Sequence, residues 1–230
     1  MQHLPDVSVR KLNHHFNKSL QMKEIEMNNQ IYVWDRMVRF FHWTLVLAFI
    51  IAYLSGDELE LVHAYTGYYI LGLIAVRVVW GFIGTRYARF SQFLYPPSAA
   101  ITYLKNLFSK QTDKKPKEHY IGHNPAGSWM VIALLLSILA TGFSGLKLYE
   151  LEGKGPLATT VTEYSQLQQI AHDDENEQDE DLWEDIHEFF ANFTVLLIFL
   201  HFGGVILSGR KHHQNLVKSM ITGYKTKNTQ

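Results

Sequence analysis

The sequence predicts an all-α protein, an integral membrane bundle of four helices. Three observations predict this fold class: four long apolar stretches, charges that are segregated among the connections, and no pattern of strands. A helix needs roughly 20 apolar residues to cross a hydrocarbon core at about 1.5 Å per residue. If the stretches were instead buried helices of a soluble domain, a chain of 230 residues would leave too little sequence to cover them. The expected spans are residues 37–55, 62–84, 128–148 and 186–208.

The spans divide the chain into three parts. Residues 1–30 are polar and contain no apolar run or small-residue cleavage site, so we expect a cytoplasmic N-terminal extension without a secretory signal. Residues 31–210 hold the four spans as one membrane domain. Residues 211–230 follow the last span and are expected to form a cytoplasmic tail.

Charged residues predict how the chain is oriented in the membrane. Lys and Arg gather before the first span, between the second and third spans, and after the fourth. The sequence GDELEL at 56–61 has neither, and the connection 149–185 is dominated by carboxylates between Asp173 and Asp185. Because basic connections stay on the cytoplasmic side, we expect a multi-pass protein of a bacterial inner membrane with both termini inside.

Two connections have features of their own. In the inner connection, Pro96 and Pro97 predict the start of a helix, and the amphipathic sequence AAITYLKNLF that follows suits the membrane surface. The outer connection 149–185 is expected to be partly flexible and strongly negative. Its acidic run either docks a positively charged partner or serves as a solvated connection.

The chain contains no cysteine, which restricts the metal chemistry that it can support. Disulfides, thiolate-bound iron–sulfur clusters, thioether-linked haem and cysteine zinc sites are excluded. Any metal must therefore be held by histidine or by carboxylates.

Four of the twelve histidines lie inside or at the ends of the apolar spans: His42, His63, His187 and His201. The other eight occupy aqueous or interfacial segments, where a polar ring costs little. Ionisable residues inside a membrane are expensive and usually face the bundle interior for a functional reason. These four are therefore the candidate functional residues.

The spacing of the four histidines sorts them into two levels. His187 and His201 are 14 residues apart, about 21 Å along one helix. With both termini inside, His42 and His201 fall in the inner half of the membrane, and His63 and His187 fall in the outer half. Two imidazoles at each level are what a six-coordinate haem iron needs. We therefore expect two non-covalent b-type haems, the inner iron bound by His42 and His201 and the outer iron by His63 and His187.

Small and cationic residues lie near these histidines. The glycines either admit a flat macrocycle or serve ordinary helix packing. Arg39 and Arg77 lie near the inner surface and are predicted to pair with haem propionates, although topology determination and lipid contact also account for such charges. The glycines concerned are Gly67, Gly142, Gly145, Gly203 and Gly204.

Short motifs distributed along the chain support the same interpretation. They are RFFHW at 39–43, the spacing from His63 to Gly67, RVVWGFIG at 77–84 with ARF at 88–90, and GHNPAG at 122–127. With these motifs and a fourth span that carries two histidines, the chain resembles the bacterial cytochrome b561 family over roughly residues 31–210. This family includes the b-type cytochrome subunits of nickel–iron hydrogenases.

The resemblance implies that the protein transfers electrons between membrane quinone and a redox partner on the periplasmic face, either a c-type cytochrome or an oxidoreductase subunit. It also implies that His42, His63, His187 and His201 are the haem ligands. No catalytic residue is assigned, no nucleic-acid partner is expected, and assembly into a homo-oligomer stays open. Compared with a compact member of the family, this chain has an extended N-terminus and a long acidic outer connection.

Two other functions remain open from the residues alone. The first is a stand-alone oxidoreductase linked to quinone, in which the outer haem takes electrons from a small molecule such as superoxide. The second is a metal or proton transporter in which the intramembrane histidines bind zinc or relay protons. Carboxylates are scarce in the spans, with Glu188 as the exception, and the pairing of histidines by depth favours haem.

Overall fold

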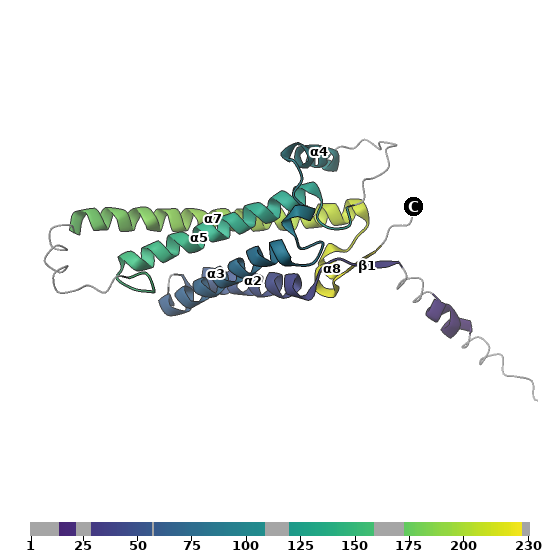
Figure 1. The fold of residues 1–230 in the computed structure, drawn as a ribbon, viewed down its shortest axis with the longest axis horizontal. Coiled ribbons are helices and arrows are strands. Elements are labelled where there is room, and N and C mark those ends of the chain that lie inside the picture. The colour runs from purple at the N-terminus through teal and green to yellow at the C-terminus, as the bar shows by residue number, and fades with distance from the viewer. Residues whose placement is uncertain (1–13, 22–28, 57, 109–119, 159–172, 227–230) are drawn as a thin grey trace, which may run out of the picture.

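We describe the protein from a computed structural model, which places residues 14–21, 29–56, 58–108, 120–158 and 173–226. Helices dominate this part of the chain (Figure 1). The elements are β1 (Gln30–Tyr32), α2 (Arg36–Ser55), α3 (Glu60–Ile83), η1 (Phe90–Gln92), α4 (Pro97–Phe108), α5 (Pro125–Leu151), α7 (Asp173–His212), α8 (Leu216–Thr222) and β2 (Tyr224–Thr226).

Four helices are long and apolar enough to cross a membrane: α2, α3, α5 and residues 178–212 of α7. Their most apolar windows have mean hydropathies of 1.6 to 2.1, yet at most 22% of the residues in any window are buried within the protein. Apolar side chains on the exposed faces of these helices would be unfavourable in water but suit the hydrocarbon core of a membrane. The predicted all-α membrane bundle is therefore confirmed.

The first three helices begin and end close to the expected spans. The expected spans 37–55, 62–84 and 128–148 compare with observed helices that begin at Arg36, Glu60 and Pro125. The third helix starts earlier than expected because Asn124 caps it and a proline occupies its first turn. Proline fits there, since the first turn does not need its backbone N–H.

The fourth helix is much longer than the apolar run within it. The expected span was 186–208, whereas α7 begins at Asp173 and ends at His212. Carboxylates near a helix N-terminus interact favourably with the helix dipole, which explains why an acidic sequence continues the helix. The part of the outer connection that begins at Asp173 is therefore helical and not a flexible loop, while residues 159–172 lie outside the described part of the chain.

The spanning helices form two hairpins that lie side by side (Figure 1). One hairpin is α2 with α3, the other is α5 with α7, and α3 also contacts α5. Where the hairpins meet, small and branched apolar side chains pack together. This cluster consists of Ala48 and Ala52 from α2, Ile70 and Ile74 from α3, and Ile138 from α5.

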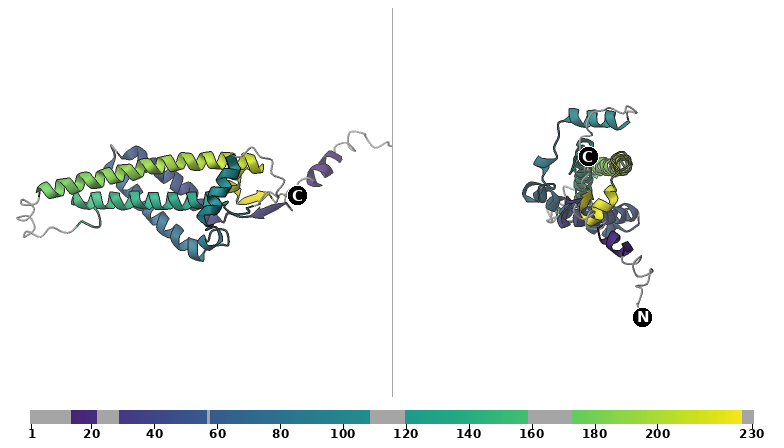
Figure 2. Two further views of the ribbon diagram at one scale, coloured as in Figure 1. Left: turned by 90° about the horizontal axis from the view of Figure 1, so that it is seen from above. Right: turned by 90° about the vertical axis from the view of Figure 1, so that its right-hand side faces the viewer.

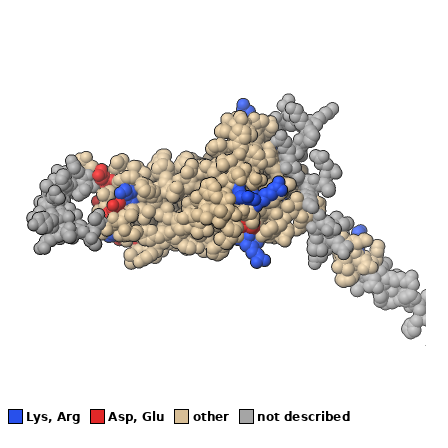
Figure 3. Space-filling model, viewed as in Figure 1, with Lys and Arg blue, Asp and Glu red and all other residues tan. Residues whose placement is uncertain are grey.

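A two-stranded sheet closes one end of the bundle. Strands β1 and β2 pair antiparallel, with Ile31 opposite Lys225. The segments that precede the first span and follow the last one therefore lie at the same end. Helix α4, the expected amphipathic helix, lies at this end and runs crosswise to the bundle (Figure 2). On the face in Figure 3, most Lys and Arg side chains lie near this end, and Asp and Glu gather mainly at the other.

Asp35 links the first two spans at the end that carries the sheet. Its Oδ1 accepts a hydrogen bond of 2.8 Å from the backbone N–H of Val38 and so caps α2. Its Oδ2 accepts bonds from Trp80 Nε1 at 3.1 Å and from Thr85 Oγ1 at 2.5 Å. Burial raises the pKa of Asp35, but these hydrogen bonds together bring it below its ordinary value of 3.8. The carboxylate form therefore stabilises the fold.

Asp35→Ala should lower the free energy of unfolding by about 2 kcal/mol, because it removes a helix cap and leaves two donors without an acceptor. Unfolding by SDS in mixed micelles measures this loss. Since the folded pKa of Asp35 is lowered, its contribution is present above pH 3.8 and is lost as the pH falls below that value. Asp181→Ala, an exposed carboxylate on α7, is the matched control and should change little. Equal stability of both variants would contradict the assignment.

Candidate functional site

The four intramembrane histidines come from three of the spanning helices. His42 lies in the second turn of α2, and His63 lies in the first turn of α3. His187 and His201 both lie on α7. All four side chains are partly buried within the bundle, so none of them simply faces the surroundings.

His63 and His187 face each other across the interface between α3 and α7. Their ring centroids are 5.8 Å apart, and the ring planes are inclined by 76°. Two imidazoles on opposite sides of one metal ion, with metal–nitrogen bonds of about 2 Å, have centroids roughly 6 Å apart. The structure therefore brings this pair to a separation that accommodates one metal between the rings.

Hydrogen bonds to backbone carbonyls orient both rings of this pair. His63 Nδ1 lies 2.9 Å from the carbonyl oxygen of Ala52, and His187 Nδ1 lies 2.9 Å from that of Thr141. A carbonyl oxygen only accepts, so each Nδ1 carries a hydrogen and donates it. In a neutral imidazole the lone pair then lies on Nε2. Histidines that bind metals are oriented in this way, with the second ring nitrogen donating to a carbonyl or carboxylate.

Helix α5 supplies the surface on which the His187 ring rests. The Thr141 carbonyl belongs to α5, and Ser144 Oγ lies 3.2 Å from His187 Nδ1. A Cβ atom built on Gly145 would lie 2.9 Å from His187 Cε1 and 3.1 Å from Nδ1. Any larger residue at position 145 would therefore displace the ring. Gly145 serves the histidine and not the general packing of the helices.

His42 and His201, the second predicted pair, lie toward the end of the bundle that carries β1 and β2, and their pairing stays a prediction. The two side chains lie close enough to interact electrostatically. The His42 ring meets the Trp43 ring edge to face at 5.2 Å, and His42 Nδ1 is enclosed without a hydrogen-bond partner. An enclosed ring nitrogen without a partner is costly in an apolar environment, and a bound group removes that cost when it uses the nitrogen.

Open space adjoins a histidine in each pair. Gly67 follows His63 by one turn of α3, and a Cβ atom built on it meets nothing within 4 Å. The same holds for Gly203 and Gly204, which follow His201 on α7. Gly67 and Gly203 are themselves partly buried, whereas Gly204 is exposed. These positions fit the close approach of a flat group that is bound through the histidines.

Gly142 differs from these glycines. A Cβ atom built on it would lie 2.5 Å from Leu71 Cδ2, so its role is close packing of α5 against α3. Close packing therefore accounts for Gly142, whereas the approach of a flat macrocycle stays a prediction for Gly67, Gly203 and Gly204.

Arg77 is an enclosed guanidinium on α3, with 4% of its surface exposed. Its Nη2 donates to the carbonyl oxygen of Ala88 at 3.2 Å, and its Cζ lies 5.1 Å from the centre of the Phe90 ring. Its Nη1 is buried without a hydrogen-bond partner. Arg77 therefore has a donor available for an anion, as a propionate ligand requires.

Arg39 has a structural contact that accounts for part of its side chain. Its Nη1 donates to the carbonyl oxygen of Ile221 at 2.5 Å and so ties α2 to α8. Its Nε is enclosed without a partner. The predicted propionate contact of Arg39 stays a prediction, beside an observed role in holding the C-terminal segment.

Two residues near the inner pair were not among the sequence candidates. His123 was counted with the histidines of the aqueous segments, yet its ring packs between those of Trp34 and Phe93, each at a centroid distance of 4.6 Å. It interacts electrostatically with His201 and with Lys225, a buried residue of β2. The motif GHNPAG, which includes His123, was the available signal; Lys225 had none beyond its charge.

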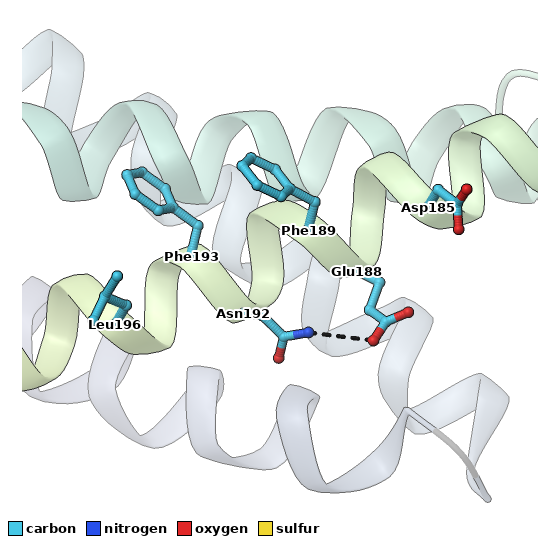
Figure 4. A pocket seen from close by; sticks show the side chains of 6 residues that line it. All are labelled: Asp185, Glu188, Phe189, Asn192, Phe193 and Leu196. Atoms are coloured by element: carbon cyan, nitrogen blue, oxygen red, sulfur yellow. Dashed lines mark hydrogen bonds between the residues drawn. The ribbon is translucent and has the colours of Figure 1, made fainter.

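A shallow groove of about 480 Å³ lies on α7, apart from both histidine pairs (Figure 4). Within it, Asn192 Nδ2 donates to Glu188 Oε1 at 3.3 Å. Glu188 thus has a partner on its own helix. In the described ranges, no group of three or more His, Asp or Glu side chains is placed to hold a metal ion. The groove is lined by Asp185, Glu188, Phe189, Asn192, Phe193 and Leu196.

Comparison with known proteins agrees with this geometry. The chain is 24% identical over 89% of its length to a probable Ni/Fe-hydrogenase B-type cytochrome subunit of Rhodobacter capsulatus, 85% of which is covered. It is 25% identical over 87% of its length to the protein of the same description from Rhizobium leguminosarum bv. viciae, 90% of which is covered. No solved structure matches the chain. The model of the prokaryotic cytochrome b561 family matches residues 33–223, which include all four spans and both histidine pairs, and the chain therefore belongs to this family of membrane helical bundles that bind haem b.

Proposed function

We propose that this cytochrome carries electrons across a bacterial inner membrane, between the quinone pool and a periplasmic partner, through two b-type haems. The family supports transmembrane electron transfer and haem b. The observation that carries the more specific proposal is the pair His63 and His187. Their rings come from different helices, lie 5.8 Å apart, and both donate from Nδ1 to a carbonyl.

The chain's own residues divide into ligands and residues that position them. His63 and His187 would hold the outer haem, and His42 and His201 the inner haem. A haem held at either site would supply a one-electron change of its iron. The carbonyls of Ala52 and Thr141 keep the outer rings in the tautomer that offers Nε2.

The two levels suit passage across the membrane. His187 and His201 are separated by about 21 Å along α7, so the two sites lie in opposite halves of a hydrocarbon core that is about 30 Å thick. The basic segments around α2, α4 and α8 support a cytoplasmic location for that end of the bundle. The outer pair would then exchange electrons with the periplasm.

The outer end has features that suit a positively charged protein partner. Asp179, Asp181 and Glu184 are exposed near the N-terminus of α7. The two relatives are described as subunits that belong with a hydrogenase. We propose a c-type cytochrome or a hydrogenase-type subunit as the partner, attracted by the carboxylates of α7.

Purified protein should contain two non-covalent haems, visible in reduced-minus-oxidised spectra and in a haem assay. Alanine at His42, His63, His187 or His201 should each remove about half of the haem, because a six-coordinate site loses one of two ligands. The variants at His63 and His187 should lose the same spectral component.

The control for these variants is His213→Ala, which changes an exposed histidine beyond α7 and should retain both haems. A colourless wild-type protein, purified from cells that are supplied with haem, would end the cytochrome proposal. Loss of different spectral components in the His63 and His187 variants would contradict the proposed pairing.

Gly145→Ala should weaken retention of the outer haem about tenfold, because the new Cβ atom would displace the His187 ring from the Thr141 carbonyl. The haem that remains bound after dilution into detergent measures this effect. Gly72→Ala is the matched control, because a Cβ atom there meets nothing within 4 Å. If both variants retain haem equally, Gly145 does not position the ligand.

Replacing Asp179, Asp181 and Glu184 by Asn, Asn and Gln should slow electron exchange with a cationic c-type cytochrome by roughly tenfold at low ionic strength, because electrostatic steering sets such rates. Stopped-flow absorbance measures the second-order rate constant. The difference from the wild type should vanish at high salt, which screens exposed charges. An unchanged salt dependence in the triple variant would exclude this face as the docking site.

A further inference from the structure

Enclosed cationic and donor side chains gather beside the inner histidine pair. Arg77 of α3 has 4% of its surface exposed, and Lys225 of β2 has 8%. His123, in the segment before α5, interacts electrostatically with both of them and with His201. The His123 ring lies 4.6 Å from that of Trp34, and Lys225 Nζ lies 5.3 Å from the same Trp34 ring. Groups from elements that are distant in sequence therefore lie in one region at the end that carries the sheet.

Lys225 is a buried ammonium group without a carboxylate partner. Its Nζ donates to the carbonyl oxygen of Gly122 at 2.9 Å and lies 5.3 Å from the centre of the Trp34 ring. None of the ion pairs formed among the described residues includes it. Burial lowers the pKa of Lys225 to about 8, so the group is still mostly protonated at neutral pH. An ammonium group has three donors, and the Gly122 carbonyl uses one of them.

His123 reports the same positive surroundings. Burial, together with the charges of Lys225, Arg77 and His201, lowers its pKa to about 3. Its Nδ1 is enclosed without a hydrogen-bond partner. The neutral ring of His123, which interacts with the cations of Lys225 and Arg77, therefore has one ring nitrogen without a hydrogen-bond partner.

Among the residues that the structure describes, no ion pair neutralises this cluster. Asp35 interacts electrostatically with Arg77, but its two oxygens already accept hydrogen bonds from Val38, Trp80 and Thr85. Arg77 Nη1 stays enclosed without a partner. Buried charges are normally paired, because removing them from water is costly. The unused donors therefore suit an anionic ligand.

We propose that Lys225, His123 and Arg77 form a pocket for an oxyanion, and that the carboxylate side groups of the haem between His42 and His201 occupy it. This inference rests on the proposed function, because it requires the inner haem. A lipid phosphate has similar chemistry, but the donors are enclosed by the chain itself and adjoin a haem ligand. That placement favours the haem carboxylates.

The position of Lys225 depends on a feature outside the family match. The match to the family model ends at residue 223, and Lys225 follows in β2. The pairing of β2 with β1 sets Lys225 opposite Ile31, and this register directs the buried side chain toward Trp34 and Gly122. The short sheet therefore positions the ammonium group of Lys225 beside the bundle.

Lys225→Met tests the pocket through properties of the bound haem and not through activity. We expect several-fold weaker retention of one of the two haems and a lower midpoint potential for that haem alone, because a nearby positive charge stabilises the state with one more electron. Lys225→Arg keeps the charge and should retain most of both properties. Lys218→Met, an exposed lysine of α8, is the matched control and should leave both haems unchanged.

Reconstitution with two compounds identifies the anion. Apoprotein loaded with haem b should show the effect of Lys225→Met, whereas apoprotein loaded with the haem dimethyl ester, whose carboxylates are blocked, should not. Equal effects with both compounds, together with loss of bound phospholipid, would assign the pocket to a lipid and overturn the inference.

The same preparations separate this inference from the proposed function. A wild type that binds fewer than two haems contradicts the proposed function directly. Two haems in the wild type, with unchanged retention and potentials in Lys225→Met, would overturn only the pocket. If Lys225→Met does not fold, His123→Gln is the second variant, with several-fold weaker retention of the same haem expected and unchanged retention overturning the pocket.

Discussion

The hydrogen bonds from His63 and His187 to two helix carbonyls orient these rings at the end of the bundle opposite the sheet. Ala52 lies in the last turn of α2, and its carbonyl oxygen accepts from Ser55 Oγ of the same helix at 3.2 Å as well as from His63 Nδ1 at 2.9 Å. The Thr141 carbonyl lies inside α5 and is reached through the gap above Gly145. Each ring thus has a carbonyl partner within the protein, where lipid offers none. The end of α2 supplies one carbonyl, and the absence of a side chain at Gly145 leaves room for the ring that reaches the other.

The contact between α5 and α7 is also fixed between the two histidine levels. Thr194 is fully buried and lies midway between His187 and His201 along α7. Its hydroxyl is 2.7 Å from that of Ser137 on α5, and it donates to the Phe190 carbonyl in its own helix. A polar contact at this depth sets the register of the two helices. This buried pair of hydroxyls therefore contributes to the positions of both α7 histidines relative to α5.

Much of the fold could be predicted because the membrane imposes simple rules on the sequence. Apolar length predicted the spans, and the cost of a polar ring in hydrocarbon singled out the four histidines. The start of α7 at Asp173 was missed because hydropathy marks the apolar part of a helix and not its extension into water. The surroundings of His123 were missed because Trp34, Phe93 and Lys225 meet it only through the folding of distant segments.

The cations at the end that carries the sheet show the limit of the sequence most clearly. In sequence, Arg36, Arg86, Arg77 and Lys225 all belong to the same positive pattern that orients a membrane chain. In the structure, Arg36 and Arg86 are exposed, where water and salt screen their charge, and orientation is a sufficient explanation for them. Arg77 and Lys225 are enclosed, where an unpaired charge destabilises the fold. A role in orienting the chain does not offset that cost. Burial therefore separates exposed charges, which orientation explains, from enclosed charges, for which we propose a bound anion, and burial is decided by tertiary contacts such as the pairing of β1 with β2.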